Sequence, residues 1–118
     1  MKLDHIVLMV SDLEASLPYY KTLLGLLGFT KSRDHVWGNE DGIYFDFKEA
    51  TEAGEGYKRY GVGLNHLGFT ADSKEAVEEI ADKMKAAGFE VPAVQRLGNY
   101  ALFMKDRDGM RFEITYYA

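Results

Sequence analysis

The stretch D-G-I-Y-F-D-F at residues 41–47 returns near the end of the chain as D-G-M-R-F-E-I at residues 108–114. Each copy follows a strand-like run that opens with a histidine, H-I-V-L-M-V at residues 5–10 and H-L-G-F-T at residues 66–70. Internal repetition at this spacing indicates one supersecondary unit that is used twice. The repeat therefore predicts two copies of one architecture, each with a histidine and a carboxylate at matching places.

The two copies define modules at about residues 1–50 and 62–118, and a Gly- and Glu-rich linker at about residues 51–61 joins them. Each module is expected to run strand, helix, then three strands. With 118 residues the chain is one ordinary domain, large enough to bury a core but small for an enclosed active site. We therefore expect a homodimer in which the partner helps to complete the cavity.

In the first module, the S-D-L-E segment at residues 11–14 supplies side chains of the kind that cap helices. Pro18 would break a hydrogen bond deep inside a helix, so we expect the helix proper to begin near Leu17. Gly25 or Gly28 is expected to end it. Short strands are predicted at residues 29–30 and 36–37, a hairpin turn at 39–42 and a further strand at 43–48.

In the second module, Asp72 and Glu75 resemble a capping box at the start of a helix that Gly88 ends. The apolar stripe of this helix is predicted to consist of Val77, Ile80, Ala81, Met84 and Ala87. Strands are predicted at residues 89–94, 99–105 and 110–116, with a turn at 106–109.

One helix can cover only one face of a sheet, so the other face of each module must meet the other module or a cavity. Side chains alternate along a strand, and burial of the apolar residues toward the helix turns four polar side chains to the uncovered faces. These four are His5, Asp46, His66 and Glu113. Two imidazoles and two carboxylates in matching positions form a candidate metal site.

The composition excludes several classes of function. The net charge is -5 and the lysines and arginines are scattered among acids, so nucleic acid is not expected as a partner. The chain has no cysteine, which excludes disulfides, thiolate nucleophiles and cysteine-based zinc sites. No apolar run approaches the ~18 residues of a membrane span, so we expect a cytoplasmic protein without a membrane partner.

Four motifs together resemble the vicinal oxygen chelate superfamily, which includes glyoxalase I, extradiol dioxygenases, methylmalonyl-CoA epimerase and the fosfomycin- and bleomycin-resistance proteins. They are D-H-I-V-L-M-V-S-D-L at the start, Y-Y-K-T-L-L-G in the first helix, L-N-H-L-G-F-T at the second start and D-R-D-G-M-R-F-E-I at the end. The family's usual D-P-D-G turn reads D-R-D-G here. The resemblance implies an α+β fold of two tandem βαβββ modules that form a cleft, with His5, His66 and Glu113 as metal ligands.

The resemblance also gives Asp46 a role. In glyoxalase-like and epimerase-like members the first module adds a fourth ligand, Glu or Gln, on its last strand, whereas extradiol dioxygenases and fosfomycin-resistance proteins use three. The repeat aligns Asp46 with Glu113, so we assign Asp46 to the fourth position. Aspartate is one methylene shorter than the usual residue, which leaves both direct coordination and a supporting role open. His35 lies outside both repeats and is expected to be structural or exposed.

Two nitrogen and two oxygen ligands suit a divalent ion such as Ni, Zn, Co, Fe or Mn. Such an ion acts as a Lewis acid on adjacent substrate oxygens, with Glu113 or Asp46 as the catalytic base. The leading hypothesis is a glyoxalase I-like lyase or isomerase that acts through a metal-bound enediolate on a small carbonyl substrate, with glutathione or another thiol left open. A non-haem Fe(II) dioxygenase that uses only His5, His66 and Glu113 is one alternative. The other is a metal-free small-molecule-binding protein of the drug-resistance type.

Overall fold

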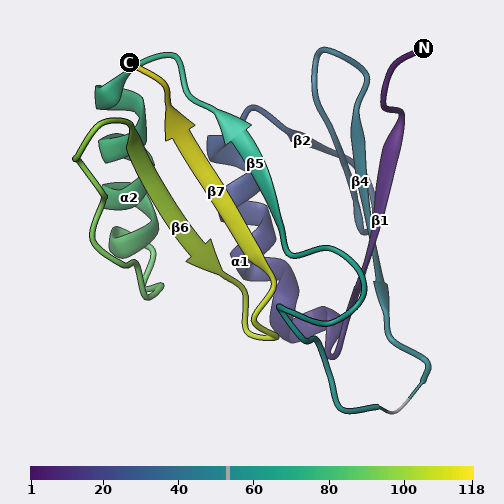
Figure 1. The fold of residues 1–118 in the computed structure, drawn as a ribbon. Coiled ribbons are helices and arrows are strands. Elements are labelled where there is room, and N and C mark those ends of the chain that lie inside the picture. Colours follow the sequence, from purple (N-terminus) through teal and green to yellow (C-terminus); the bar gives the residue numbers. More distant parts are fainter. Residues whose placement is uncertain (53) are drawn as a thin grey trace. The chain divides into compact units, whose positions relative to one another are not determined.

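The computed structural model describes residues 1–52 and 54–118, which divide into two compact modules, Met1–Gly56 and Tyr57–Ala118 (Figure 1). Their boundary falls inside the linker expected from the sequence. Each module combines a helix with a sheet, so the predicted α+β class is confirmed. Neither helix in the described part of the chain has the length and apolar character of a membrane span.

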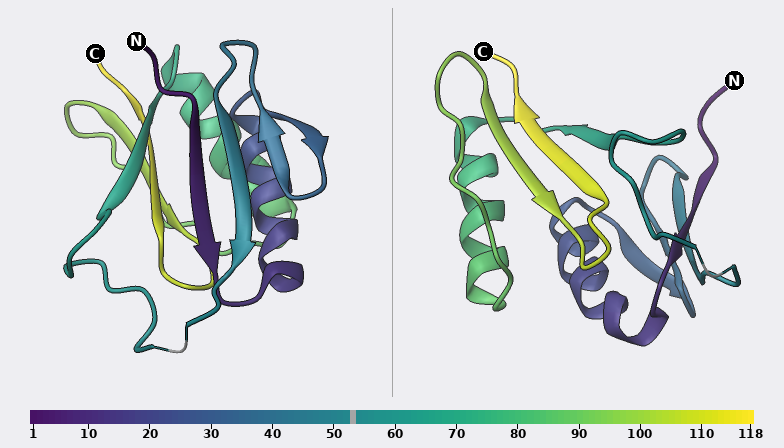
Figure 2. Two further views of the ribbon diagram at one scale, coloured as in Figure 1. Left: turned by 90° about the vertical axis from the view of Figure 1, so that its right-hand side faces the viewer. Right: turned by 60° about the horizontal axis from the view of Figure 1, so that its bottom comes forward.

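The first module builds a 4-stranded sheet around the strand that opens the chain. Its elements are β1 (His5–Val10), α1 (Leu13–Leu26), β2 (Thr30–Arg33), β3 (Val36–Gly38) and β4 (Tyr44–Glu49). The strand order is β1-β4-β3-β2, and only the β1-β4 pair is parallel. Figure 2 shows this pair side by side. A parallel pair needs a long crossover, and α1 with the β2-β3 hairpin supplies it.

The prediction that the first helix begins near Leu17 is wrong. The side chain of Asp12 accepts a hydrogen bond from the amide of Ala15 at 3.0 Å and starts the helix one residue after the aspartate. Pro18 lies inside α1, where the cap and the buried helix face outweigh the hydrogen bond that its ring nitrogen cannot donate. Gly28, one of the two glycines expected to end the helix, follows it with φ of 91°.

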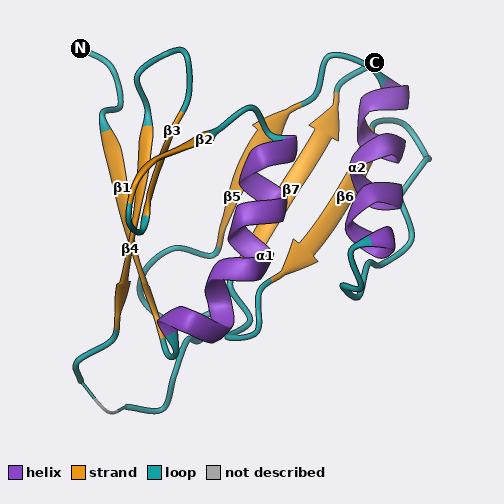
Figure 3. Cartoon of the chain, turned by 180° about the vertical axis from the view of Figure 1, so that it is seen from behind, coloured by secondary structure: helices purple, strands orange, loops and turns teal. Residues whose placement is uncertain are grey.

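The second module places a helix against a 3-stranded sheet (Figure 3). Its elements are β5 (His66–Thr70), α2 (Lys74–Ala86), β6 (Tyr100–Lys105) and β7 (Arg111–Tyr116). The strand order is β5-β7-β6, with β5 and β7 parallel and β6 antiparallel to β7. The last strand therefore runs beside the histidine-led strand, as β4 runs beside β1.

The cap of α2 differs from the prediction by one residue. Ser73, not Asp72, is the N-cap, and its hydroxyl oxygen accepts a hydrogen bond from the amide of Ala76 at 3.1 Å. Ser73 can do this because its backbone is extended while the helix begins at the next residue. Gly88 adopts φ of 93° beyond the helix, as expected. Of the predicted stripe, four residues are buried and only Ala87 is exposed: Val77, Ile80, Ala81 and Met84.

The strand predicted at residues 89–94 is also wrong, because this segment pairs with no strand in the described structure. Among the described residues, one isolated bridge, between Gln95 and Ala101, pairs the segment after α2 with β6. A strand here would lie at the sheet edge beyond β6, where proline is tolerated, so Pro92 alone does not account for its absence. The second module thus has two strands after its helix, one fewer than the predicted βαβββ pattern.

The core of the first module joins α1 to β4. The rings of Tyr20 and Phe47 lie 4.5 Å apart between their centroids, and Phe45 is fully buried beside them. Asp46 lies between the two phenylalanines and is only half-buried, because alternate side chains of a strand point to opposite faces. In the second module Phe112 and Ile114 are buried on β7 while Glu113 is half-buried. The predicted alternation is therefore confirmed in both modules.

Candidate metal and substrate site

The first module brings His5 and Asp46 to the same uncovered face of its sheet. In the parallel β1-β4 pair, His5 is the register partner of Tyr44 and Val7 is the partner of Asp46. Residues two apart on one strand share a face, so His5 and Val7 lie beside Tyr44 and Asp46. The His5 side chain is 56% exposed, which leaves its ring accessible to a ligand.

The second module repeats this arrangement in the same register. His66 is the partner of Arg111 and Gly68 is the partner of Glu113. Nε2 of His66 lies 4.0 Å from Oε2 of Glu113, and these side chains are 37% and 22% exposed. In both modules the carboxylate stands opposite the second residue after the histidine. Asp46 and Glu113 therefore occupy equivalent positions.

The tautomer of His66 follows from the hydrogen bonds of Asn65. The amide nitrogen of Asn65 donates to the carbonyl oxygen of Arg59 at 2.8 Å, which identifies the other atom of that amide as the oxygen. This oxygen lies 2.7 Å from Nδ1 of His66, so Nδ1 carries the hydrogen and donates. In the neutral ring, Nε2 then carries a lone pair and faces the carboxylate of Glu113.

His5 is held in the same way by the residue before it. Its Nδ1 lies 2.7 Å from Oδ2 of Asp4, and a carboxylate can only accept, so Nδ1 donates here as well. This hydrogen bond is the main cause that lowers the pKa of Asp4. Nε2 of His5 is left as the nitrogen with a lone pair. Ligating histidines commonly have their second nitrogen held by such a partner.

The sequence interpretation did not single out Asp4 and Asn65, although the sequence contained a signal for them. Each histidine that opens a module is preceded by a residue whose short side chain bears an oxygen. Both oxygens accept from Nδ1 at 2.7 Å. The repeated element is thus a two-residue unit, an oxygen acceptor followed by a histidine.

Tyr57 holds the backbone of the two residues that precede His66. Its hydroxyl lies 2.6 Å from the carbonyl oxygen of Leu64 and 2.8 Å from that of Asn65. A hydroxyl has one hydrogen to donate, so the two carbonyls share it. This contact and the Asn65 bond together hold the turn that leads into β5.

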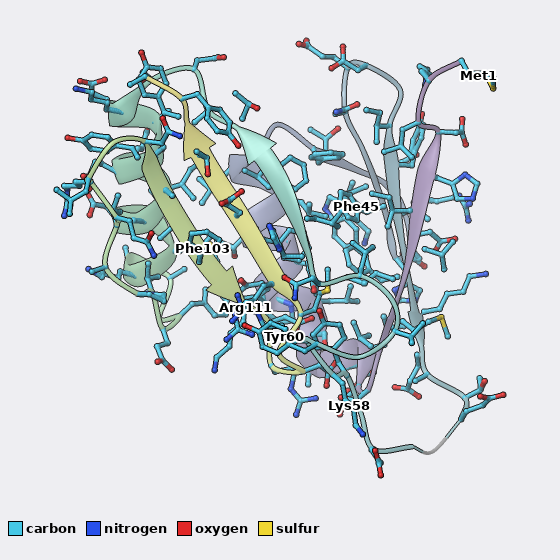
Figure 4. All side chains as sticks on the ribbon, viewed as in Figure 1. Met1, Phe45, Lys58, Tyr60, Phe103 and Arg111 are labelled. Atoms are coloured by element: carbon cyan, nitrogen blue, oxygen red, sulfur yellow. The ribbon has the colours of Figure 1, made fainter. Side chains whose placement is uncertain are left out.

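Gly68 and Phe103, the neighbours of Glu113 on the two adjacent strands, shape the space around its carboxylate. A Cβ atom on Gly68 would lie 3.4 Å from Oε2 of Glu113, so the carboxylate leans over bare backbone. On the other side Phe103, labelled in Figure 4, is the register partner of Glu113 on β6. The rings of Phe103 and His66 meet edge to face, with 6.2 Å between their centroids. An apolar wall thus stands beside the second histidine-carboxylate pair.

A cavity of about 410 Å³ opens on the uncovered face of the first module's sheet. This volume lies in the range that holds small organic ligands. The lining includes His5 and Asp46, the two predicted site residues of this module. The full set of lining residues is Asp4, His5, Ser32, Arg33, Val36, Tyr44 and Asp46.

The predicted site residues fall into two pairs, one in each module. Among residues 1–52 and 54–118, no three His, Asp or Glu side chains form a group that could hold a metal ion. His35 occupies the turn between β2 and β3 with φ of 65°, and its carbonyl oxygen accepts from the amide of Phe47 at 2.9 Å. Its side chain is exposed, which is one of the two outcomes expected from the sequence.

Comparison with known proteins identifies the family. The chain matches the model of the Glyoxalase/Bleomycin resistance protein/Dioxygenase superfamily over residues 2–114. It is 35% identical over 124 residues to the protein YqjT of Bacillus subtilis (strain 168), with 96% of this chain and 97% of that protein covered.

Solved structures agree with this match. A protein from Bacillus halodurans is 29% identical with a TM-score of 0.80, covering 97% of this chain and 94% of that one. The lactoylglutathione lyase of Agrobacterium tumefaciens is 20% identical with a TM-score of 0.69, covering 98% and 92%, which shows a shared fold. Family model, relative and fold lead to one conclusion: the chain belongs to the Glyoxalase/Bleomycin resistance protein/Dioxygenase superfamily.

Proposed function

We propose that this chain is a divalent-metal-dependent enzyme of the glyoxalase type, a lyase or isomerase that acts on a small carbonyl substrate. One observation carries the proposal. Each module presents a histidine and a carboxylate in the same register, and each histidine has Nδ1 engaged so that Nε2 keeps its lone pair. Two imidazole nitrogens with lone pairs and two carboxylates are groups that can each donate an electron pair to a cation.

The donor set fits a divalent ion of the first transition series. His5 and His66 would supply imidazole nitrogens, and Asp46 and Glu113 would supply carboxylate oxygens, with no sulfur ligand. When bound there, the ion supplies Lewis acidity toward two adjacent oxygens of a substrate. The facing pair of His66 and Glu113 supports this fit, because a lone pair and a carboxylate 4.0 Å apart do not bond to each other.

The chain's own groups would move the proton. A carboxylate placed beside the reacting carbon can take the proton next to a carbonyl and return it to the neighbouring carbon, which isomerises the substrate. Glu113 is our first choice for this base, since it leans over Gly68 and has room to turn. Asp46 is the second choice, because it lines the cavity of the first module.

One observation favours a second candidate, a non-haem Fe(II) dioxygenase. Within the described residues Glu113 lies near the histidine of its module, whereas no ion pair joins Asp46 to His5. A site built from His5, His66 and Glu113 alone would have the composition of a two-histidine, one-carboxylate triad. Asp46 is then the residue whose contribution separates the two functions.

Metal analysis tests the proposal directly. Protein purified without added metal should contain about one divalent ion per chain, and His5→Ala or His66→Ala should abolish this stoichiometry, because each removes one of two nitrogen ligands. His35→Asn is the matched control, since asparagine tolerates the positive φ at this turn. Full metal content in both alanine variants would overturn the proposed site.

A further inference from the structure

Strand β2 contains an irregularity that changes which side chains face the cavity. Lys31 pairs with Trp37 on β3, and Arg33 pairs with Val36, so the register shifts between Lys31 and Arg33. Two residues of β2, Ser32 and Arg33, thus stand opposite one residue of β3. This arrangement is a β-bulge, a feature that re-aims side chains beside binding sites.

The bulge brings an arginine to the face that carries His5 and Asp46. In a regular strand paired through Lys31 and Trp37, Ser32 would stand opposite Val36 and Arg33 would turn to the other face. With the bulge, both Ser32 and Arg33 line the cavity.

A row of three residues crosses the sheet here. Val36 is the register partner of Arg33 on one side and of Asp46 on the other. Strands lie about 4.8 Å apart, so the backbones of Arg33 and Asp46 are roughly 10 Å apart with Val36 between them. A small molecule over Val36 can therefore reach the carboxylate with one end and the guanidinium with the other.

The charge of Arg33 is available to a ligand. Among the described residues, no side chain forms a hydrogen bond or an ion pair with the guanidinium of Arg33. Lys31, two residues earlier, forms an ion pair with Asp34 at 3.4 Å. A guanidinium is a planar fork of donors that matches a carboxylate in two parallel hydrogen bonds. The adjacent Ser32 hydroxyl adds a further donor.

Tyr44 gives the cavity a flat wall. A Cβ atom on Gly38 would lie 2.4 Å from Cε1 of Tyr44, so the tyrosine ring rests on the bare backbone of its register partner. The ring stands next to His5, the partner of Tyr44 on β1. A planar group of a ligand would lie against it.

We propose that Ser32 and Arg33, turned into the cavity by the bulge, bind a carboxylate at the end of the substrate remote from His5 and Asp46. The substrate is then a small carbonyl compound that carries a carboxylate, with its planar part beside Tyr44. The identification of this ligand as the substrate rests on the proposed function. The binding of a carboxylate by Arg33 is independent of the proposed function.

A matched pair of probes tests this binding. Phenylacetate and its neutral amide, phenylacetamide, share a ring and a size and differ in charge. Calorimetric titration should give tighter binding of phenylacetate by the wild-type protein. Arg33→Gln should weaken phenylacetate by about tenfold or more, the effect of one hydrogen bond to a charged group, and leave phenylacetamide unchanged. Arg33→Lys keeps the positive charge but not the planar fork of donors. Its affinity for phenylacetate should lie between those of the wild type and Arg33→Gln.

Lys31→Gln is the control, because Lys31 carries the same charge on the same strand and faces Asp34 instead. It should bind both probes as the wild type does. Equal phenylacetate affinity in wild type and Arg33→Gln, or equal weakening of both probes, would overturn the proposal. So would a wild-type protein that does not prefer phenylacetate.

The titrations are repeated after treatment with a chelator, so that a metal-bound carboxylate is distinguished from one held by Arg33. We expect phenylacetate to bind more weakly to Arg33→Gln than to the wild type both before and after the chelator treatment. A difference that disappears with the metal would assign the anion to the ion and overturn the role of Arg33. Failure to turn over any carbonyl compound would overturn the proposed function and leave this binding result in place.

Discussion

Asn65 holds His66 in one tautomer, since its oxygen lies 2.7 Å from Nδ1 of the histidine while its nitrogen donates to the carbonyl of Arg59 at 2.8 Å. Asn65→Ala removes the acceptor and frees the ring to rotate or to change tautomer. We expect affinity for a divalent ion to fall by about tenfold to a hundredfold, the usual effect of losing such a partner. Competition against a chelating dye measures this affinity.

Asn99→Ala is the control for that experiment. The side chain of Asn99 accepts from the amide of Ala118 at 3.3 Å and belongs to neither histidine unit. Its loss should leave metal affinity as it was. Unchanged affinity in Asn65→Ala would show that His66 does not depend on this partner.

Asp46→Ala separates the two candidate enzymes. If four protein groups hold the ion, the variant should bind metal more weakly and lose proton abstraction from a hemithioacetal, with no oxygen consumed. If the site is an oxygenase triad, the variant should keep Fe(II) and the oxygen-dependent cleavage of a catechol, because three ligands suffice. We expect the first outcome, because Asp46 and Glu113 occupy equivalent register positions in their two modules. Undiminished oxygen uptake with a catechol would favour the dioxygenase.

Gly38→Ala should displace the ring of Tyr44 with little change in stability. The new Cβ would overlap the ring, but Tyr44 is 38% exposed and can swing outward. Alanine in a strand also recovers roughly 0.5–1 kcal/mol of the backbone entropy that glycine loses. Urea unfolding should therefore differ from wild type by less than about 1 kcal/mol, while phenylacetate binds more weakly.

Gly25→Ala is the comparison for this variant, because a Cβ there meets nothing within 4 Å. It should leave phenylacetate binding unchanged. If Gly38→Ala bound phenylacetate as tightly as Gly25→Ala, the Tyr44 ring would have no part in the cavity wall.

The chain is expected to form a homodimer. Val7 and Met9 on the uncovered face of β1 are 45% and 49% exposed, and a partner chain would cover these apolar side chains. Sedimentation velocity at micromolar concentration should report a dimer, and Val7→Lys should shift it toward monomer. Val62→Lys makes the same change at an exposed loop position and should not. A wild-type monomer under these conditions would contradict the expectation.

Features that depend on strand periodicity could be predicted from the sequence. The alternation around Phe45, Asp46 and Phe47 predicted which side chains are buried, and the structure confirms it. The pairing of each histidine strand with the last strand of its module was not predicted, but it is the same in both modules, as the internal repeat would require. These signals are strong because one slipped residue would turn the apolar set outward.

Features that break a period could not be predicted in this way. A bulge adds one residue to a strand without any signature in composition, so Arg33 was not expected to line the same cavity as Asp46. Pro18 shifted the predicted helix start, because the Asp12 cap outweighs a single missing hydrogen bond. The apolar pattern at residues 89–94 favoured a strand, but in the described structure only Gln95, just beyond this segment, pairs with β6.

In each module, the length of the acidic side chain is complementary to the size of the residue beside it on the neighbouring strand. The longer Glu113 lies over Gly68, and the shorter Asp46 stands beside Val7. A double exchange, Val7→Gly with Asp46→Glu, would give the first half the same pair of residues as the second at these two positions. Exchanging only the acid would place the longer side chain against Val7, so we expect Asp46→Glu to be tolerated better together with Val7→Gly than alone.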